Sequence, residues 1–427
     1  MLTCQRKVAA VVILGGRMDN TLLDRDGRAY GMEEGHFDPV LVHVGPRTPA
    51  GELLRRYWQP IALSSDATTL PKLIRRFSED LILFRNQRGE VGLLYPRCAH
   101  RGTSLVYGRV EEDGIRCCYH GWKFGTRGHC LDQPCEPDGG RNRARIRQPW
   151  YPVVEQFGAI WTYMGPPDKQ PLFPVFSCFE GLGETEMIEA EYFSAKGEIQ
   201  PFPVDHNWFQ TFDNATDHYH VPILHARNSG PQFPDPRLTT KIPEEISWKY
   251  AADGRSILTF SKRVIEGTGE AWMRIEQGIM PNMLALPPFF GDGPSATVTA
   301  FVPIDDTHFV TIDINRKTAQ SNIYPTEVDG WGFGPERKIW GQMDFEYHQR
   351  HPLDYEAQAG QGQITLHSQE HLAFTDRGLG MHRRLFKQQC EAVTKGGDPV
   401  GVAFKEEDRL VRIEARSWME PVEPSIR

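Results

Sequence analysis

Short hydrophobic runs separated by turns recur along the whole chain. In the first third they are LILFRN (81–86), VGLLYP (91–96) and EQFGAIWTYMG (155–165). Further along they are SILTFSKRV (256–264), SATVTAFVP (295–303) and HFVTIDINR (308–316), the last alternating with a period of two. Because each run is short and bounded by charged residues, glycine or proline, the pattern predicts β-strands.

Other segments have the period of amphipathic helices. They cover residues 207–225, 335–351 and 376–393, and a shorter amphipathic piece, LLRRYWQ, covers 53–59. The Pro-Pro-Asp cluster at 166–168 follows the first group of strands and predicts a domain boundary. We therefore expect a polar, partly flexible N-terminal extension (1–45), a small β domain (46–166) and a larger α+β domain (167–427).

Composition and charge narrow the possible functions. The chain has 427 residues and a formal net charge of −8, and its basic residues never form a run, which argues against nucleic-acid binding. No apolar run approaches the ~20 residues that a membrane helix needs. The eight cysteines are sparse, and five of them gather between residues 98 and 135, unlike a secreted disulfide framework. We expect metal binding in a reducing compartment, the cytoplasm.

The first candidate site combines two short loops. Cys-Ala-His at 98–100 is followed, sixteen residues later, by Cys-Cys-Tyr-His at 117–120. A Rieske [2Fe–2S] cluster needs two thiolates on one iron and two imidazoles on the other. Two loops that each supply one Cys and one His meet this need, so the predicted ligands are Cys98, His100, Cys117 and His120. Zinc is the competitor, but zinc fingers pair Cys with Cys and His with His.

The second candidate site lies in the helical segment that carries Asp213, Asp217, His220 and His225. Non-heme Fe(II) oxygenases hold iron by two His and one carboxylate and leave the opposite face open. Pro222 lies between the two histidines, so we expect the helix to be irregular there. The motif is weak alone, because a His in a helix is more often an ordinary buried residue. The upstream cluster motif favours the iron interpretation.

The residues around both sites resemble those of aromatic-ring-hydroxylating Rieske oxygenases. Cys-x-His-Arg-Gly begins at Cys98, Cys-x-x-His-Gly-Trp begins at Cys117, and 207–225 resembles the iron helix of that family. The resemblance runs from about Pro46 to Val393 and is strongest to the branch of phthalate dioxygenases and aryl O-demethylases. It departs at Cys118, where the family usually has proline. It implies a small all-β Rieske domain followed by a larger helix-grip catalytic domain.

The resemblance also implies roles for the acidic residues. Asp217 is expected to bridge an iron-binding His and a cluster His, His100 or His120, of a neighbouring subunit, with His120 favoured. The third iron ligand is expected further along, where Asp354 precedes the Glu-His-Leu segment at 370–372. Asp376 is the alternative and Glu356 a distant third. Asp213 is either a residue supporting the site or a surface acid.

A terminal oxygenase function follows from this resemblance. The implied cofactors are a Rieske cluster and a mononuclear Fe(II), and the substrates are O₂ and an aromatic compound that is ring-hydroxylated or O-demethylated. The chain lacks a dinucleotide fingerprint, so electrons are expected from a separate NAD(P)H-dependent reductase, with or without a ferredoxin. A homotrimer is also implied. Two other functions stay open: a Rieske electron-transfer protein without oxygenase activity, and a zinc-stabilised binding module.

The candidate walls of a substrate cavity are Trp272, Met280, Met283, Phe289 and Phe290.

Overall fold

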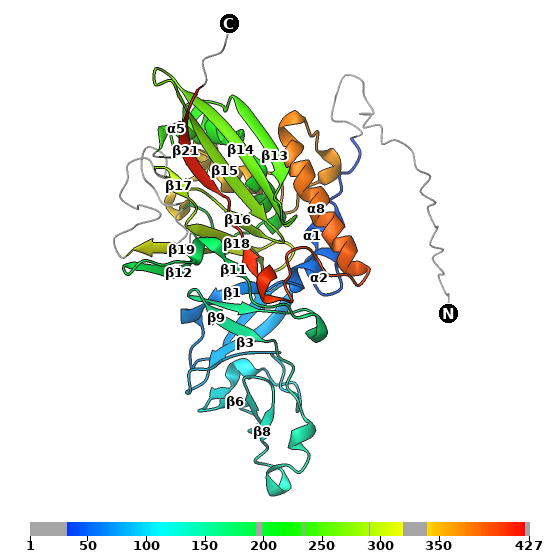
Figure 1. Ribbon diagram of the computed structural model, residues 1–427. Coiled ribbons are helices and arrows are strands. Elements are labelled where there is room, and N and C mark those ends of the chain that lie inside the picture. Colours follow the sequence, from blue (N-terminus) through cyan, green and yellow to red (C-terminus); the bar gives the residue numbers. More distant parts are fainter. Residues whose placement is uncertain (1–31, 194–198, 234, 290, 319–339, 423–427) are drawn as a thin grey trace, which may run out of the picture.

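The structure is a computed structural model, and it describes residues 32–193, 199–233, 235–289, 291–318 and 340–422. A small β-rich part forms one end of the molecule, and a larger part built on one wide sheet forms the other (Figure 1). Mixed sheets and helices make the chain an α+β protein, as the sequence predicted. Within the described residues, no helix is long and apolar enough to cross a membrane.

The small part contains three antiparallel sheets. The first has the order β1-β10-β9, the second β2-β3-β4 and the third β5-β6-β7-β8. Their strands are β1 (Gln59–Leu63), β2 (Lys72–Arg76), β3 (Glu79–Arg85), β4 (Val91–Leu94), β5 (Arg109–Val110), β6 (Gly114–Arg116), β7 (Lys123–Gly125), β8 (Cys130–Asp132), β9 (Val153–Gln156) and β10 (Ala159–Thr162).

A nine-stranded sheet forms the centre of the larger part. Seven strands follow the order β12-β19-β18-β16-β15-β14-β13, while β21 pairs with β15 and β17. They are β12 (Glu186–Tyr192), β13 (Glu245–Tyr250), β14 (Ser256–Ile265), β15 (Glu270–Ile279), β16 (Met283–Ala285), β17 (Gly293–Pro294), β18 (Thr297–Pro303), β19 (Phe309–Thr318) and β21 (Arg416–Pro421). A separate parallel pair joins β11 (Val175–Phe176) to β20 (Leu410–Val411).

Helices lie against this sheet, and the long helix α8 also packs on the N-terminal helices α1 and α2 (Figure 1). The helices are α1 (Pro39–Val42), α2 (Pro49–Arg55), α3 (Trp208–Asp213), α4 (His220–Pro222), α5 (Pro236–Thr239), α6 (Phe345–Arg350), α7 (Asp354–Ala359) and α8 (Arg377–Thr394). A π-helical turn, Ile223–Asn228, continues directly from α4.

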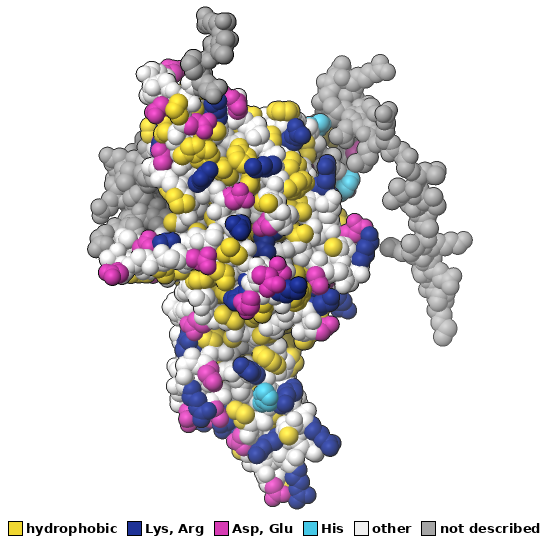
Figure 2. Space-filling view, in the orientation of Figure 1, with side chains coloured by type: hydrophobic (Ala, Val, Ile, Leu, Met, Phe, Trp, Pro, Cys, Tyr) yellow, Lys and Arg dark blue, Asp and Glu magenta, His cyan; other side chains and the backbone are white. Residues whose placement is uncertain are grey.

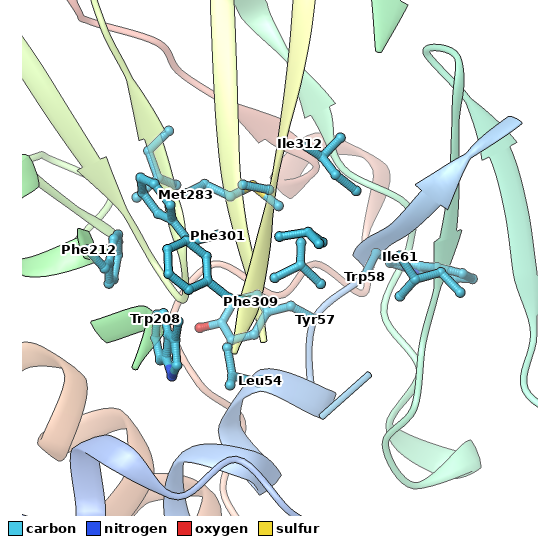
Figure 3. Close-up of a cluster of buried hydrophobic side chains, with 14 of the residues drawn as sticks. Leu54, Tyr57, Trp58, Ile61, Trp208, Phe212, Met283, Phe301, Phe309 and Ile312 are labelled. Atoms are coloured by element: carbon cyan, nitrogen blue, oxygen red, sulfur yellow. The ribbon is translucent and has the colours of Figure 1, made fainter. Parts of the chain in front are cut away.

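One apolar core joins the two parts of the molecule. Figure 3 shows Leu54, Tyr57 and Ile61 of the N-terminal elements near side chains of the wide sheet and of α3. The rings of Trp208 and Phe212 of α3 are stacked, with centroids 5.5 Å apart and an interplanar angle of 25°. Because these side chains are almost fully buried, the core fixes α3, and therefore the segment that follows it, against the sheet.

Most predicted elements are present, with three differences. The run at 155–165 is not one strand but the hairpin β9–β10, because Phe157 and Gly158 both have positive φ and reverse the chain. Strand β15 was not predicted, and neither were most of the shorter strands, among them β1, β2, β12, β13 and β21. The segment 335–351 contains a helix only from Phe345 to Arg350, and residues 335–339 lie outside the described residues.

The N-terminal extension is described only from residue 32. From Pro39 onward it is folded, because helix α1 buries Leu41 and Val42 and contacts α8. Its last residues are therefore part of the core of the larger half, although they precede the small β domain in sequence.

Candidate metal sites and active-site cavity

The two Cys–His loops at the tip of the small domain have the same backbone geometry. In each, the N–H of the cysteine, Cys98 or Cys117, donates to the carbonyl five residues later at 2.9 Å. Its carbonyl accepts from the glycine four residues later, Gly102 at 2.8 Å and Gly121 at 3.1 Å. Both glycines have positive φ, 77° and 71°, which side-chain-bearing residues rarely adopt. The two loops are therefore closed turns that present one Cys and one His each.

The side chains of the four predicted cluster residues converge. Cys98 and Cys117 are free and buried, and the rings of His100 and His120 lie 4.6 Å apart. Burial, together with the neighbouring Cys117 thiol, raises the pKa of Cys98 to about 11. The buried Cys98 thiol is thus a poor anion unless a cation lies beside it. This donor set fits an iron–sulfur cluster, whose irons would provide that charge.

A second group of metal-binding side chains forms in the larger part. His220 Nε2 lies 3.4 Å from Asp354 Oδ1, and His225 Nε2 lies 3.2 Å from Asp354 Oδ2. One ligand atom of each residue lies within 4.8 Å of the others. His220 begins α4, His225 lies in the π-helical turn and Asp354 begins α7. The irregular helix around Pro222 turns both rings toward the same carboxylate.

Charge at this triad favours a bound cation. Burial disfavours a charged ring, yet Asp217 and Asp354 raise the pKa of His220 to about 9. Asn214 donates to Asp354 Oδ1 at 3.2 Å, and its Nδ2 lies 3.5 Å from His220 Nε2. His225 Nε2 is buried and lies 3.2 Å from Asp354 Oδ2, but it forms no hydrogen bond with that carboxylate. Two His and one carboxylate with an unsatisfied ring nitrogen fit a mononuclear iron.

The outer nitrogens of the two histidines have different partners. His220 Nδ1 lies 3.3 Å from Asp217 Oδ2, a carboxylate. His225 Nδ1 lies 2.8 Å from Gln232 Oε1, a neutral amide. Gln232 Nε2 in turn donates to Pro352 O at 3.4 Å, two residues before Asp354. Such partners fix the ring orientation and tautomer of a ligand histidine, so Gln232 holds His225 with Nε2 facing the triad.

The other acidic candidates lie elsewhere. Asp376 Oδ2 accepts from Ala373 N at 2.6 Å in the turn before α8. Glu356 Oε1 accepts from His348 Nδ1 at 2.8 Å. Asp213 is buried and pairs with Arg383 at 2.6 Å, and it does not line the cavity described next. Of the three carboxylates considered as the third ligand, only Asp354 lies beside both histidines.

A cavity of about 220 Å³ opens beside the triad. The sheet provides its floor, including Arg274 and Glu276 of β15, and the triad lies in its wall. Of the predicted walls, Phe289 lines this cavity, while Trp272, Met280 and Met283 do not. Met280 and Met283 line a smaller cavity of about 40 Å³, and Phe290 lies outside the described residues. The remaining lining residues are mostly apolar, among them Phe193, Leu238, Leu284, Leu286, Phe301 and Leu353.

Buried charges form one side of this cavity. Arg274 Nε donates to Glu276 Oε1 at 2.9 Å, and Glu276 Oε2 lies 2.9 Å from His218 Nε2. Burial opposes ionisation of Glu276, but His218 and Arg274 hold its pKa well below the usual range. Asn214, Gln232, Arg274 and Glu276 were not found from the sequence. Each also has a partner further away in the chain, such as Asp354 for Asn214 and Pro352 for Gln232, and no motif in the sequence marks these pairs.

Most of the chain is similar to known proteins. Residues 57–155 match the Rieske [2Fe-2S] domain family. The chain is 44% identical over 396 residues to phenoxybenzoate dioxygenase subunit alpha of Ectopseudomonas oleovorans, covering 92% of this chain and 94% of that protein. It is 36% identical over 390 residues to the tert-butanol monooxygenase / tert-amyl alcohol desaturase oxygenase subunit of Aquincola tertiaricarbonis, covering 85% and 78% of the two chains.

A solved structure shares the fold. The crystal structure of dicamba monooxygenase bound to dicamba superposes with a TM-score of 0.56 at 17% identity, covering 81% of this chain and 99% of that one. At this identity the likeness concerns the fold alone.

A Rieske [2Fe-2S] domain followed by a catalytic part with a 2-His-1-carboxylate triad defines a class of iron enzyme. The chain belongs to the Rieske non-heme iron oxygenases, as an oxygenase (alpha) subunit of the branch that contains phthalate dioxygenases and aryl O-demethylases. Its cofactors are a Rieske [2Fe–2S] cluster and a mononuclear iron.

Proposed function

We propose that this terminal oxygenase inserts oxygen from O₂ into an aromatic acid, by ring hydroxylation or oxidative O-demethylation. The observation that carries the proposal is the triad of His220, His225 and Asp354 at the wall of a largely apolar cavity. The Asp354 side chain is 43% accessible because it faces this cavity. A substrate there would lie against the open face of the metal site. The relative named for phenoxybenzoate supports an aromatic acid.

Each metal group is assigned its own ligands in this proposal. Cys98, His100, Cys117 and His120 hold the cluster, and His220, His225 and Asp354 hold the iron. When bound, the cluster supplies single electrons and the iron activates O₂. The residues around the iron position it and exclude water. Asn214 and Gln232 orient its ligands, and the apolar walls keep bulk solvent away from the reacting substrate.

Asp217 is proposed as the link between the two metal groups of neighbouring subunits. Its Oδ2 lies beside His220 while its side chain is still 38% exposed, so it can also accept a hydrogen bond from a second chain. Its Oδ1 accepts from Tyr219 N at 2.8 Å, which fixes the carboxylate. A cluster histidine of the neighbour, His120 or His100, is the proposed donor.

A head-to-tail homotrimer would place that neighbour, since a closed ring brings one surface of each subunit to a different surface of the next. Charge supports the arrangement. Between residues 57 and 155 there are 15 Lys and Arg but 11 Asp and Glu, although the whole chain has a net charge of −8. Figure 2 shows Lys and Arg side chains around the end of the small domain. A positive domain facing a negative one would favour association.

A separate NAD(P)H-dependent reductase, with or without a ferredoxin, completes the proposed system. It would deliver electrons at the small domain, where Tyr119 is exposed beside His120. We place the system in the cytoplasm, where NAD(P)H and reducing conditions would keep the cysteines as thiols.

The test is a reconstituted turnover assay. The iron-loaded protein, a Rieske oxygenase reductase and NADH are supplied with 3-phenoxybenzoate, phthalate or vanillate, and O₂ use and product mass under ¹⁸O₂ are measured. Incorporation of ¹⁸O, or release of formaldehyde from vanillate, is expected for at least one acid. A protein with about three irons per chain that reduces its cluster but uses no O₂ with any acid would contradict the proposed substrate class.

A further inference from the structure

We infer that Arg274 binds the carboxylate of the substrate and thereby decides which end of it reaches the iron. This inference rests on the proposed function, because it assumes that the cavity beside the triad is the substrate site. Arg274 lies on β15, is 2% exposed, and lines that cavity. Among the described residues that line it, Arg274 is the one Lys or Arg.

The hydrogen bonds of Arg274 hold its side chain still but leave donors for a ligand. Nε donates to Glu276, Nη1 to Pro288 O at 3.2 Å and Nη2 to Pro287 O at 3.5 Å. A guanidinium has five N–H groups, so one remains on Nη1 and one on Nη2. These two nitrogens form the end of the planar fork, which matches the two oxygens of a carboxylate. Because three bonds already fix the fork, binding costs little side-chain entropy.

The other charged groups of the cavity disfavour a carboxylate anywhere else. Asp217 and Asp354 lie at the iron end, and Asp313 on the floor accepts from Thr299 Oγ1 at 2.6 Å. Glu276 is ionised and held between Arg274 and His218. An anionic group placed near any of these carboxylates without Arg274 would be repelled. Among the described residues of the cavity, the charge pattern therefore favours the position beside Arg274 for the acid group.

Aromatic rings connect Arg274 to the iron ligand His225. The guanidinium carbon lies 5.9 Å from the centre of the Phe289 ring. Phe289 is stacked on Phe233 at 5.7 Å with an interplanar angle of 8°, and Phe233 meets the His225 ring edge-on at 4.7 Å. Two rings in series thus lie between the carboxylate-binding group and the metal. An aromatic acid lying along this row has its acid group at β15 and its far end at the triad.

The experiment compares acids with uncharged analogues of the same shape. Binding of benzoate and 3-phenoxybenzoate, and of benzamide and 3-phenoxybenzamide, is measured by calorimetry on the metal-loaded protein. Wild type is expected to bind at least one acid about 10- to 100-fold more tightly than its amide, the range for a hydrogen-bonded charge pair. Arg274→Gln should abolish this preference, and Arg274→Lys should keep part of it.

Two further variants serve as controls for misfolding and for the loss of an arginine elsewhere. Arg274→Gln leaves Glu276 with less compensation and can unfold the protein, so Arg274→Gln/Glu276→Gln removes both charges together. Arg237→Gln is the matched control. The guanidinium carbons of Arg237 and Arg274 both lie over the Trp272 ring, 4.6 and 5.7 Å from its centre, but Arg237 pairs with Asp235 and Asp292 and does not line the cavity. The control should keep the wild-type preference for the acid.

The outcomes separate this inference from the proposed function. Folded Arg274 variants that bind the acid as tightly as wild type, or a wild type that binds no acid better than its amide, would overturn the role of Arg274. An acid that binds through Arg274 but causes no O₂ use would leave that role intact and overturn the oxygenation of that acid instead.

Discussion

The two metal sites are built in opposite ways. The cluster site consists of two matched loops at the tip of the small domain, each closed by the same pair of backbone hydrogen bonds. The triad is assembled from an irregular helix and the start of α7, far apart in the sequence, and it faces a cavity. The first design keeps the imidazole edges near the surface, as electron transfer between proteins requires. The second places its ligand atoms at the wall of a cavity, where a bound substrate would lie beside the metal and displace water.

The side chains that contact the histidines also differ between the two sites. Around the cluster, Trp122 lies flat on His100, 4.4 Å away with an interplanar angle of 7°. Around the triad, His220 has a carboxylate partner and His225 an amide held by the chain before Asp354. The cluster ligands are thus supported by packing and local turns, whereas the iron ligands depend on hydrogen bonds between distant segments. Substitutions should therefore affect the two sites independently.

The largest expected effect is selective loss of one metal. Asp354→Ala should lose the mononuclear iron and keep the cluster, and Cys117→Ala should do the reverse, because the sites share no residue. Iron and acid-labile sulfide analysis with EPR of the reduced protein measures this: about two irons and two sulfides per chain for the first variant, against about three and two in wild type. Iron retained by Asp354→Ala would show that another carboxylate, such as Asp376, is the ligand.

The next effect concerns the link between the sites. Asp217→Asn should leave both metals bound but lower turnover by about 100-fold or more. A neutral amide would orient His220 and the cluster histidine of the neighbouring subunit less well than a carboxylate does. Asn keeps an oxygen that can accept from Tyr219 N, so the local turn should survive. Single-turnover reduction kinetics would locate the loss at electron transfer. Turnover within twofold of wild type, at full metal content, would exclude the bridging role.

These contrasts also explain what the sequence could predict. The proposed cluster ligands stand out in the sequence because their loops are short and local, and His220 and His225 because they lie on one segment. Asp354 needed the resemblance, since Asp376 and Glu356 have the same chemistry and only the fold shows their other partners. Gln232 and Arg274 carry no local signal. Trp272 was expected at the cavity, but it does not line it, and its indole N–H donates to Asp292 at 2.8 Å.

A smaller effect should follow from the amide beside His225. Gln232→Leu should weaken Fe(II) binding about 10- to 100-fold, as removal of a partner of a ligand histidine does, and leave the cluster unchanged. Gln232→Glu keeps an acceptor for His225 Nδ1 and should restore much of the affinity. Titration of the iron-free protein with Fe(II) under anaerobic conditions gives the dissociation constants.

A matched control exists for this variant. Gln389 is also buried and its side chain accepts from Val400 N at 2.9 Å, but it lies on α8 away from the triad. Gln389→Leu should cost stability without changing iron affinity. Equal iron affinities for Gln232→Leu and Gln389→Leu would mean that Gln232 contributes only packing.

The smallest expected effect is that of a substitution at Asp213, which tests whether this residue belongs to the iron site. Its carboxylate is buried and pairs with Arg383, which also pairs with Glu370, so it ties the end of α3 to α8 and to the loop before that helix. Asp213→Asn should lower the free energy of unfolding by about 2 kcal/mol, because a buried charge-assisted hydrogen bond is weakened. Iron affinity and turnover should stay near wild type, since Arg383 keeps Glu370 and α3 remains packed through Trp208 and Phe212. Urea denaturation and iron titration of the same variant measure both quantities. Full stability with reduced turnover would instead place Asp213 in the catalytic machinery. The long-range contacts that distinguish the iron site from the locally built cluster site would then include the end of α3.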